Sequence, residues 1–379
     1  MNQVDIAIIG AGIAGASLAY RLAHRAAGSR SVALLEREAQ PGYHSTGRSA
    51  AMFEATYGPP LVRALTRASR DFYDAPPPGF GDVPLLTPRG LLYVATRGQE
   101  ALAAQLYDEL SVNCPALQRC SADDALARVP VLRRGFVVSA LWEPDACDIN
   151  VHALHQGFLR GARRGGATLH CDAGLLAARR EGDGWVLQLA DGSDMRARCV
   201  VNAAGAWVDE VASMFGATPI GIVPKRRSAF TFAAPEGIAA ASWPCVIGAD
   251  ESYYFKPDAG RLLGSPANAN ATHPHDVAPE ELDIASGIHQ IEAATTMTIR
   301  RPASTWAGLR SFVADGELVI GPDDACPGFF WLAGQGGYGI QSAAAASELA
   351  AALICGDAPP PALARHGVLP QALSVQRLR

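Results

Sequence analysis

The chain has 379 residues, 49% of them hydrophobic, which is enough for two packed domains with sizeable cores. A formal net charge of −5 and the absence of a Lys/Arg run argue against a nucleic-acid-binding protein, because phosphate binding needs clustered positive charge. The eight cysteines show no C-x-x-C spacing and the N-terminus has no basic leader, so the sequence favours a reducing, cytoplasmic compartment.

A glycine-rich turn near the start joins a predicted strand to a predicted helix. Residues 5–9, DIAII, are typical of a short buried parallel strand, and GAGIAG leads directly into apolar positions at helical spacing. In such a unit Gly10 makes the tight turn, Gly12 lets the backbone approach a pyrophosphate, and Gly15 lets the helix lie close to the strand. The turn therefore predicts a dinucleotide site.

The next apolar run, SVALLE at 31–36, predicts a second parallel strand that ends on an acid. Glu36 lies 21 residues after Gly15, where a carboxylate accepts hydrogen bonds from ribose hydroxyls. Because a carboxylate at this place disfavours a 2′-phosphate, the pattern leaves NAD or FAD as the cofactor.

A polar loop follows that strand. Residues 42–58 read GYHSTGRSAAMFEATYG, in which Ser45, Thr46, Arg48 and Ser49 offer hydroxyls, backbone amides and one cation. These groups suit a phosphate or the edge of a flavin.

The middle of the chain contains runs with strand character. LLYVAT at 91–96, RRSAFTF at 226–232, SYYFKP at 252–257 and TMTIRR at 296–301 are rich in β-branched and aromatic residues. Polar residues alternate in several of them. They predict an antiparallel sheet separate from the first unit.

A second glycine loop lies near the C-terminus. FFWLA at 329–333 predicts a buried strand, GQGGYG at 334–339 repeats the G-x-G-x-x-G pattern, and residues 340–354 predict a helix. No acid-ended strand follows, so this loop is not an independent dinucleotide site. Its helix start instead offers backbone N–H groups to the same cofactor, where it would stabilise negative charge on a flavin by roughly 0.3–2 kcal/mol.

These motifs resemble those of the D-amino-acid-oxidase (DAO) family of FAD enzymes, which have GAGIAG near the start, a glutamate-ended second strand and a Ser/Thr-Gly-Arg-Ser loop. Further segments are similar to that family: VVNAAGAW at 200–207, YYFKPDAG at 253–260 and TWAGLRSFVADG at 305–316. More narrowly, the chain resembles the bacterial D-arginine dehydrogenases, with similar segments in the same order over nearly its whole length.

The resemblance implies an α/β chain with a Rossmann-like FAD-binding domain and a discontinuous α+β substrate domain built on an antiparallel sheet, as in glutathione-reductase-type folds. The FAD-binding domain is expected at residues 1–50, 145–215 and 305–379. The substrate-binding domain is expected at residues 51–144 and 216–304.

The cofactor implied by the resemblance is noncovalently bound FAD. Its expected contacts come from both glycine loops, the acid-ended strand, the polar loop and the segment 200–207. They are Gly10, Gly12, Gly15, Glu36, Arg37, Ser45, Thr46, Arg48, Ser49, Ala204, Gly205, Gly334, Gly336, Gly337, Gly339 and Ile340.

An amino-acid substrate must be held still, and its carboxylate is best fixed by an arginine fork, in which each charge-assisted hydrogen bond is worth roughly 1.5–3 kcal/mol. On a strand Arg226 and Arg227 point to opposite faces, so only one of them faces the pocket. The match to the family's PKRRSAF segment selects Arg227. The match of GLRSF places Arg310 at the family's second carboxylate-binding arginine.

The resemblance assigns three further contacts in the pocket. Tyr57 and Tyr254 match family tyrosines that line the substrate site, where a phenol donates to a carboxylate while its ring shapes the cavity. Gly308 matches a glycine whose carbonyl accepts a hydrogen bond from the substrate amine. The two tyrosines and the two arginines form the expected catalytic set.

Three positions that are expected to line the substrate pocket depart from the D-arginine dehydrogenase pattern. Met52 stands where those enzymes have a histidine, so an acid–base role is lost. Leu91 stands where they have the glutamate that pairs with a cationic side chain, and burying a cation there without a partner would cost several kcal/mol. Glu54 replaces a threonine, and it either supplies an anion from another wall, is solvated or lies in a mobile lid. The departures favour a substrate with an apolar or neutral side chain.

The sequence therefore predicts an FAD-dependent amino-acid dehydrogenase or oxidase that converts D-amino acids to imino acids, and then to 2-oxo acids and ammonia. Oxidation of a secondary amine or N-alkyl amino acid on the same fold stays open, as does a noncatalytic flavin-binding protein. No hydrolase or metal-site motif is present.

No motif identifies the electron acceptor, which can be a quinone, another carrier or O₂. The apolar stretch 340–355 contains Ser and Glu and is shorter than the roughly 20 residues that a membrane span needs, so we expect no transmembrane segment. Peripheral contact with a membrane stays open.

Overall fold

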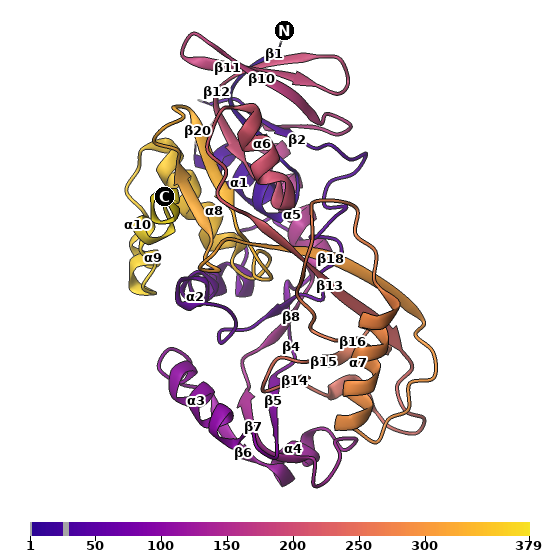
Figure 1. The fold of residues 1–379 in the computed structure, drawn as a ribbon. Coiled ribbons are helices and arrows are strands. Elements are labelled where there is room, and N and C mark those ends of the chain that lie inside the picture. The colour runs from indigo at the N-terminus through magenta and orange to yellow at the C-terminus, as the bar shows by residue number, and fades with distance from the viewer. Residues whose placement is uncertain (1, 26–29) are drawn as a thin grey trace.

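The computed structural model describes residues 2–25 and 30–379, which form two lobes joined by long strands (Figure 1). One lobe is built on a mostly parallel sheet, and the other is built on a mostly antiparallel one. The chain is therefore an α/β protein that combines a Rossmann-like unit with a second, sheet-based unit.

The parallel sheet contains the strands that the glycine motifs predict. Its strands, in spatial order, are β9 (Thr168–His170), β2 (Val32–Leu35), β1 (Asn2–Ile9), β12 (Asp194–Asn202), β20 (Phe329–Ala333) and β19 (Val319–Pro322). The first five run parallel, and β19 is antiparallel to β20. A hairpin of β10 (Leu175–Glu181) and β11 (Gly184–Leu189) pairs with the first half of β12, and β20 pairs with its second half.

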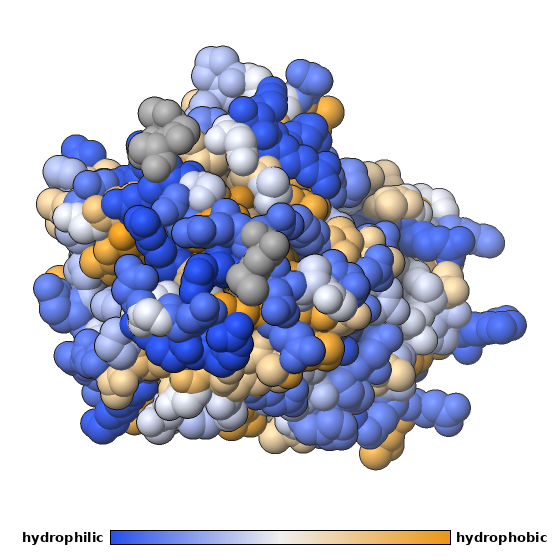
Figure 2. Space-filling view, turned by 90° about the horizontal axis from the view of Figure 1, so that it is seen from above, coloured by the Kyte–Doolittle hydropathy of each residue, from blue (hydrophilic) through white to orange (hydrophobic). Residues whose placement is uncertain are grey.

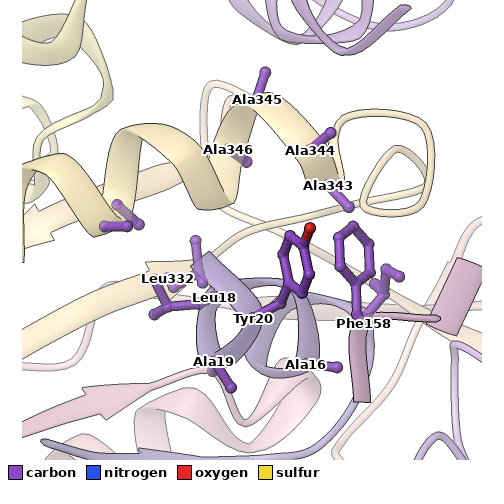
Figure 3. Close-up of a cluster of buried hydrophobic side chains, with 14 of the residues drawn as sticks. Ala16, Leu18, Ala19, Tyr20, Phe158, Leu332, Ala343, Ala344, Ala345 and Ala346 are labelled. Carbon is purple, nitrogen blue, oxygen red and sulfur yellow. The ribbon is translucent and has the colours of Figure 1, made fainter. Parts of the chain in front are cut away.

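Helices cover one face of this sheet. They are α1 (Ile13–Arg25), α5 (Val151–Arg164) and α8 (Ala343–Cys355). Figure 3 shows the rings of Tyr20 from α1 and Phe158 from α5 beside the first turn of α8, and the ring centres lie 5.5 Å apart. The alanines of that turn are buried and small, so α8 packs close to both helices. The two glycine loops thus lead into helices of one shared core.

The other face of the sheet is covered by shorter elements. They are α6 (Val208–Met214), which follows the short helix η1 (Gly205–Trp207), and the β10–β11 hairpin. Their apolar residues pack against the alternate side chains of β1, β2 and β20. Both faces of the central strands are therefore buried, which explains their continuous apolar sequence.

The second sheet is long and strongly non-local in sequence. Its strands, in spatial order, are β17 (Asn270–Ala271), β13 (Val223–Phe232), β16 (Arg261–Ser265), β15 (Tyr254–Asp258), β14 (Cys245–Gly248), β5 (Leu91–Thr96), β7 (Val137–Glu143) and β6 (Gln118–Ser121). On its other side β13 pairs with β18 (Ser304–Phe312) over the whole length of β18. Only the β14–β5 pair among these described strands is parallel.

The remaining elements surround these two sheets. A small sheet contains β3 (Met52–Phe53), β8 (Cys147–Ile149) and β4 (Leu86–Pro88). The other helices are α2 (Pro60–Asp74), α3 (Glu100–Leu110), α4 (Ala122–Arg128), η2 (Ala240–Ser242), α7 (Glu281–Ala294), α9 (Pro361–Arg365), α10 (Pro370–Leu373) and η3 (Val375–Leu378).

Most of the expected strands form, and one does not. The predictions at 91–96, 226–232 and 329–333 are confirmed, and SYYFKP overlaps β15. The strand predicted at 296–301 is wrong: its side chains alternate between buried and exposed, but the segment makes no strand pairing. The amide of Ile299 donates instead to the Glu292 side chain at 2.6 Å, so a side chain takes the place of a neighbouring strand.

The division of the chain into five sequence pieces stays a prediction. It assigns residues 305–379 to the FAD-binding domain, whereas β18, at 304–312, pairs with β13 of the second sheet. This strand is therefore a structural link between the two lobes, as Figure 1 shows.

The surface seen from above the first lobe is mostly hydrophilic, and its hydrophobic residues appear as small separate spots (Figure 2). Scattered apolar residues of this kind are normal on a protein surface. Within the described ranges, none of the helices combines the length and hydrophobicity required to cross a membrane.

Candidate active site

The turn after β1 brings backbone close to the start of α1. Gly10 has a φ of +100°, and a Cβ there would lie 2.5 Å from the carbonyl oxygen of Ala203. A Cβ at Gly15 would lie 1.9 Å from the Gly10 oxygen, so the helix begins directly against the strand. The amide of Ile13 donates to the Thr46 hydroxyl at 3.0 Å. An oxygen therefore already lies at the positive end of this helix, where anions bind.

Glu36 follows β2 and is buried beside this turn. Its carboxylate accepts hydrogen bonds from the amides of Ala11 at 2.9 Å and Glu38 at 3.1 Å. The guanidinium carbon of Arg37 lies 4.6 Å from the centre of the Trp207 ring. These groups line what we call the outer cavity. Its other lining residues include Gly10, Gly12, Ala204 and Gly205.

The polar loop connects the outer cavity to a second one, which we call the inner cavity. Ser45 and Thr46 line both cavities, and Ser49 lines the inner one. The hydroxyl of Ser45 donates to the Leu309 carbonyl at 2.6 Å. The loop is thereby attached to β18 of the second sheet.

Arg48 is held by the second lobe, although it also lines the inner cavity. Its guanidinium donates to the carbonyls of Val277 at 3.0 Å and Ala307 at 3.2 Å, and it forms an ion pair with Asp276. These contacts tie the polar loop to the segment before α7. A contact of Arg48 with a cofactor stays a prediction.

The terminal glycine loop lines the inner cavity, but α8 does not begin at the glycines. Residues 337–342 form turns, and the helix begins at Ala343 and not at residue 340 as predicted. Gly336 has a φ of +50°, which is outside the helical region. The Tyr73 hydroxyl also donates to the Ile340 carbonyl, which an earlier helix start would use internally.

Gln341 follows this loop and is buried. Its Oε1 accepts a hydrogen bond from the amide of Glu54 at 3.1 Å. Its Nε2 finds no acceptor in the described part of the chain. A buried donor left without a partner costs about 1–3 kcal/mol, so this wall of the inner cavity favours a bound group that offers an acceptor.

Adjacent strands β13 and β18 carry two arginines on one face. Arg310 lies opposite Lys225 in the ladder and therefore diagonally beside Arg227. Arg310 donates to the Tyr57 hydroxyl, and Arg227 donates to the Asn268 carbonyl at 2.7 Å. Both guanidinium groups line the inner cavity, and within residues 2–25 and 30–379 neither forms an ion pair with a carboxylate.

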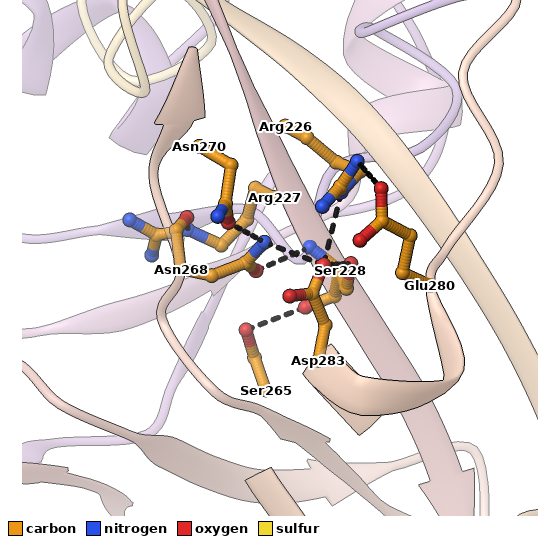
Figure 4. Close-up of polar contacts among 8 residues, drawn as sticks. All are labelled: Arg226, Arg227, Ser228, Ser265, Asn268, Asn270, Glu280 and Asp283. Carbon is orange, nitrogen blue, oxygen red and sulfur yellow. Dashed lines mark hydrogen bonds and ion pairs between the residues drawn. The ribbon is translucent and has the colours of Figure 1, made fainter. Parts of the chain in front are cut away.

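Arg226 points to the other face of β13, as strand geometry predicts (Figure 4). It donates to Asp283 at 2.9 Å and forms an ion pair with Glu280. The Nδ2 of Asn268 also donates to Asp283 at 2.9 Å. Asn268 is thus fixed by its side chain while its carbonyl holds Arg227, a role that no sequence signal indicated.

The paired cations favour an anion between them. Burial, and then the positive charge of Arg310, lowers the pKa of Arg227. A carboxylate would offset both effects, because it would attract both guanidinium groups. Tyr254 lines the same cavity. A Cβ at Gly337 would lie 1.5 Å from Nη2 of Arg310, so the arginine packs directly on the backbone of the glycine loop.

Another wall of the inner cavity is apolar. Met52, Leu91, Cys245 and Ile247 line it. Leu91 is buried and lies in the sheet between Cys245 of β14 and Glu143 of β7. Leu91 therefore offers no charge to a ligand at this wall.

Two carboxyl groups lie beside the apolar wall. Glu54 lines the cavity, and Glu143 is 1% exposed and accepts hydrogen bonds from the Ala55 amide at 2.7 Å and from the Thr56 hydroxyl. Burial raises the pKa of Glu143 to about 7, and burial together with the charge of Glu143 raises the pKa of Glu54 to about 8. At pH 7 Glu54 is therefore mostly protonated.

Lys256 is a buried cation in the lining of the inner cavity. Its Nζ donates to Asp148 at 2.6 Å, and Asp148 also accepts from Nε of Arg89 at 2.7 Å. Its ion pair makes Lys256 a weaker anion site than the unpaired arginines. In the sequence, Lys256 was indicated only by its place in the segment YYFKPDAG.

The structure brings nearly all of the expected site residues together. All of them except Gly15 and Gly334 line one of the two cavities. Gly15 acts instead through the close strand–helix contact, and a Cβ at Gly334 would lie 3.1 Å from the Glu317 carbonyl oxygen. Their individual roles stay predictions.

The residues present fit FAD. The outer cavity offers a buried carboxylate and a helix start to the nucleotide part of such a cofactor. The inner cavity offers the unpartnered Nε2 of Gln341 and the backbone of the terminal glycine loop to a flavin. The polar loop lines both, so one extended molecule can contact both cavities.

A family model described as FAD dependent oxidoreductase (DAO) matches residues 5–353. The mitochondrial dimethylglycine dehydrogenase of Rattus norvegicus is 28% identical over 274 residues, which cover 70% of this chain and 31% of that protein. The chain thus spans about a third of that relative. Glycine oxidase of Geobacillus kaustophilus is 25% identical over 359 residues, which cover 89% of both chains.

Solved structures show the same fold. The crystal structure of glycine oxidase from Geobacillus kaustophilus matches with a TM-score of 0.81 and 23% identity, covering 94% of this chain and 96% of that one. Iminodiacetate oxidase from Chelativorans sp. BNC1 matches with a TM-score of 0.78 and 22% identity, covering 93% and 96%.

A methyl group at position 337 should displace Arg310. In Gly337→Ala the new Cβ would meet its guanidinium, so we expect the Kd of a simple carboxylate such as hexanoate to rise roughly 10–100-fold. Changes in the visible spectrum of the FAD-loaded protein measure that Kd. Gly81→Ala is the control, because its methyl would lie 3.6 Å from Arg160 Nη2 on the surface. Equal affinity in both variants would contradict the packing argument.

The raised pKa of Glu143 predicts a pH-dependent stability. The folded state binds this proton more tightly than the unfolded state, so its contribution is fully present below pH 4.5 and is lost as the pH rises through about 7. The Tm of Glu143→Gln minus that of the natural chain should rise by a few degrees between pH 5 and pH 8. Exposed Glu236→Gln is the control, and a flat difference would show that Glu143 ionises normally.

Proposed function

Because the chain belongs to the DAO family of FAD-dependent oxidoreductases, we propose that it oxidatively deaminates a D-amino acid with an apolar or neutral side chain. It is an enzyme whose cofactor is FAD, and we propose that the cofactor is bound noncovalently. Bound FAD supplies the oxidant, which accepts a hydride from Cα. The resulting imino acid reacts with water to give a 2-oxo acid and ammonia.

The observation that carries the proposal is a pair of guanidinium groups that form no ion pair with a carboxylate in the described chain. Arg227 and Arg310 line the inner cavity without a carboxylate partner among the described residues. An amino-acid carboxylate between them would complete two charge-assisted contacts, worth roughly 1.5–3 kcal/mol each. Tyr57 would add a hydroxyl, because it already contacts Arg310.

The remaining residues of the cavity orient the substrate. The carbonyl of Gly308 is the proposed acceptor for the substrate amine, and a glycine leaves room for close approach. Tyr254 is the second proposed phenol at the carboxylate. Fixing the substrate at both groups limits which hydrogen of Cα faces the cofactor, and such positioning is a large part of catalysis without a nucleophile.

The proposed side-chain preference rests on the apolar wall. Leu91, Met52, Cys245 and Ile247 offer no charge, and Glu54 is mostly protonated at pH 7. A cationic side chain would lose its hydration there without gaining an ionised partner. A neutral side chain loses less and buries apolar surface.

A second candidate is the oxidation of an N-alkyl amino acid. Relatives named dimethylglycine dehydrogenase and iminodiacetate oxidase favour it. Met52 does not separate the two candidates, because its thioether takes no proton from either kind of ammonium group. The same carboxylate clamp would hold either class of substrate.

Loss of either clamp arginine should weaken substrate binding. In Arg227→Met and Arg310→Met we expect KM to rise roughly 10–150-fold, because a charge-assisted contact is lost. Arg226→Met on the opposite face of the same strand is the matched control, and its KM should change only a few-fold. Similar losses in all three variants would contradict a specific clamp.

A substrate panel at pH 7 separates the two candidates. Anaerobic bleaching of the flavin band should be fast with D-leucine, D-methionine or D-phenylalanine, and slow with D-arginine or D-lysine. Sarcosine and N,N-dimethylglycine test the second candidate. Faster bleaching by these two compounds than by any primary D-amino acid would overturn the first proposal in favour of the second.

A further inference from the structure

We propose that Glu54 determines side-chain specificity at the apolar wall: its protonated carboxyl accepts neutral side chains, and its ionised form accepts cationic ones. This inference rests on the proposed function, because it assumes that a carboxylate clamp anchors the other end of the substrate.

The position of Glu54 points to this role. Its amide donates to Oε1 of Gln341, which fixes the backbone of Glu54 against the terminal loop. Its carboxyl lines the inner cavity near the apolar wall. Its chain neighbours Met52 and Ala55 pack in one apolar cluster with Leu91 of β5 and Cys245 of β14, and Glu54 lines the same cavity as these two residues. Leu91 begins β5, and Cys245 of β14 is its partner in the ladder.

Charged and titratable groups approach Glu54 from every neighbouring element. They are Glu143 on β7, Glu251 before β15, Lys256 on β15, Arg310 on β18, Tyr93 on β5 and Cys245 on β14. Lys256 is already paired with Asp148, and Arg310 is engaged with Tyr57. No cation in the described chain forms an ion pair with Glu54 itself.

The neighbouring Glu143 carboxyl favours the protonated form of Glu54. The Glu143 carboxyl is buried and accepts hydrogen bonds from Ala55 and Thr56, but it has no cationic partner among the described residues. Two neighbouring carboxyls without a cation favour retention of a proton. The raised pKa of Glu54 agrees with this geometry.

Binding of a cationic side chain must therefore release a proton. The ligand's ammonium forms an ion pair with the Glu54 carboxylate, and the proton that Glu54 carried goes to solvent. A neutral side chain releases none. Below the pKa of Glu54, binding of the cation should strengthen about tenfold for each unit that the pH rises, whereas binding of the neutral ligand should not.

The test uses two ligands that cannot be oxidised at Cα. Hexanoate and 6-aminohexanoate have the same chain length and carboxylate, and they differ in the terminal ammonium. Their Kd values are read from the flavin spectrum of the FAD-loaded enzyme between pH 6 and pH 9.5. The Kd of 6-aminohexanoate divided by that of hexanoate should fall about tenfold per pH unit up to about pH 8 and then level off.

Variants and proton counts separate this role from a structural one. Glu54→Gln should make the Kd ratio independent of pH. Glu143→Gln should lower the pH at which the ratio levels off, and exposed Glu236→Gln should leave that pH unchanged. In weak buffer at pH 7, binding of 6-aminohexanoate to the natural chain or to Glu236→Gln should release close to one proton per site, and binding to Glu54→Gln should release none.

The outcomes distinguish the two proposals. If both ligands bind, and binding depends on Arg227, but the ratio stays flat in the natural chain, the role of Glu54 is overturned while the carboxylate clamp stands. If neither ligand binds, the clamp and the role that rests on it are both overturned. If the Kd ratio still depends on pH in Glu54→Gln, the proton belongs to another group and the role of Glu54 is overturned.

Discussion

Arg227 and Arg310 hold two positive charges on one face of a two-stranded ribbon, in a cavity where neither has a carboxylate partner among the described residues. The ribbon keeps them together, because β13 and β18 pair from Val223↔Phe312 to Thr231↔Ser304. Their directions are fixed by neutral oxygens, the Tyr57 hydroxyl and the Asn268 carbonyl, which orient a cation without neutralising it. The site therefore retains its attraction for an anionic ligand.

The same ribbon also connects the substrate side to the cofactor side. The polar loop bonds to carbonyls of Leu309 and Ala307, on either side of Gly308 in β18. The strand that carries Arg310, a proposed carboxylate-binding arginine, is thus directly attached to the loop that lines both cavities. In the proposed function, this short path would set the distance between the amino acid and the flavin, which suits a reaction that depends on positioning.

Local patterns allowed much of this to be predicted from the sequence. The strand–turn–helix units and Glu36 follow from spacing, and the choice of Arg227 over Arg226 follows from strand alternation and a motif match. Glu143 could not be predicted, because burial raises its pKa and its carboxyl is held by Ala55 and Thr56, which are distant in sequence. The unpartnered Nε2 of Gln341 likewise appears only when the terminal loop is folded.

The strand predicted at 296–301 shows the limit of periodicity. Met297 and Ile299 are buried in alternation, as the pattern requires. Pairing is a separate property, since it depends on which backbone lies next to the segment. Here the Glu292 side chain, and not a neighbouring strand, accepts the hydrogen bond of the Ile299 amide. No pattern within residues 296–301 indicates this contact.

The shared core of α1 and α8 has a consequence for how the protein is made. The two glycine loops are separated by more than 300 residues, yet their helices pack through Leu18, Tyr20 and the alanines of α8. During synthesis the first βαβ unit emerges long before its partner, so the part of its apolar helix face that α8 covers stays exposed until α8 has left the ribosome. The inner cavity is likewise complete only when the terminal glycine loop, which lines it, has been made.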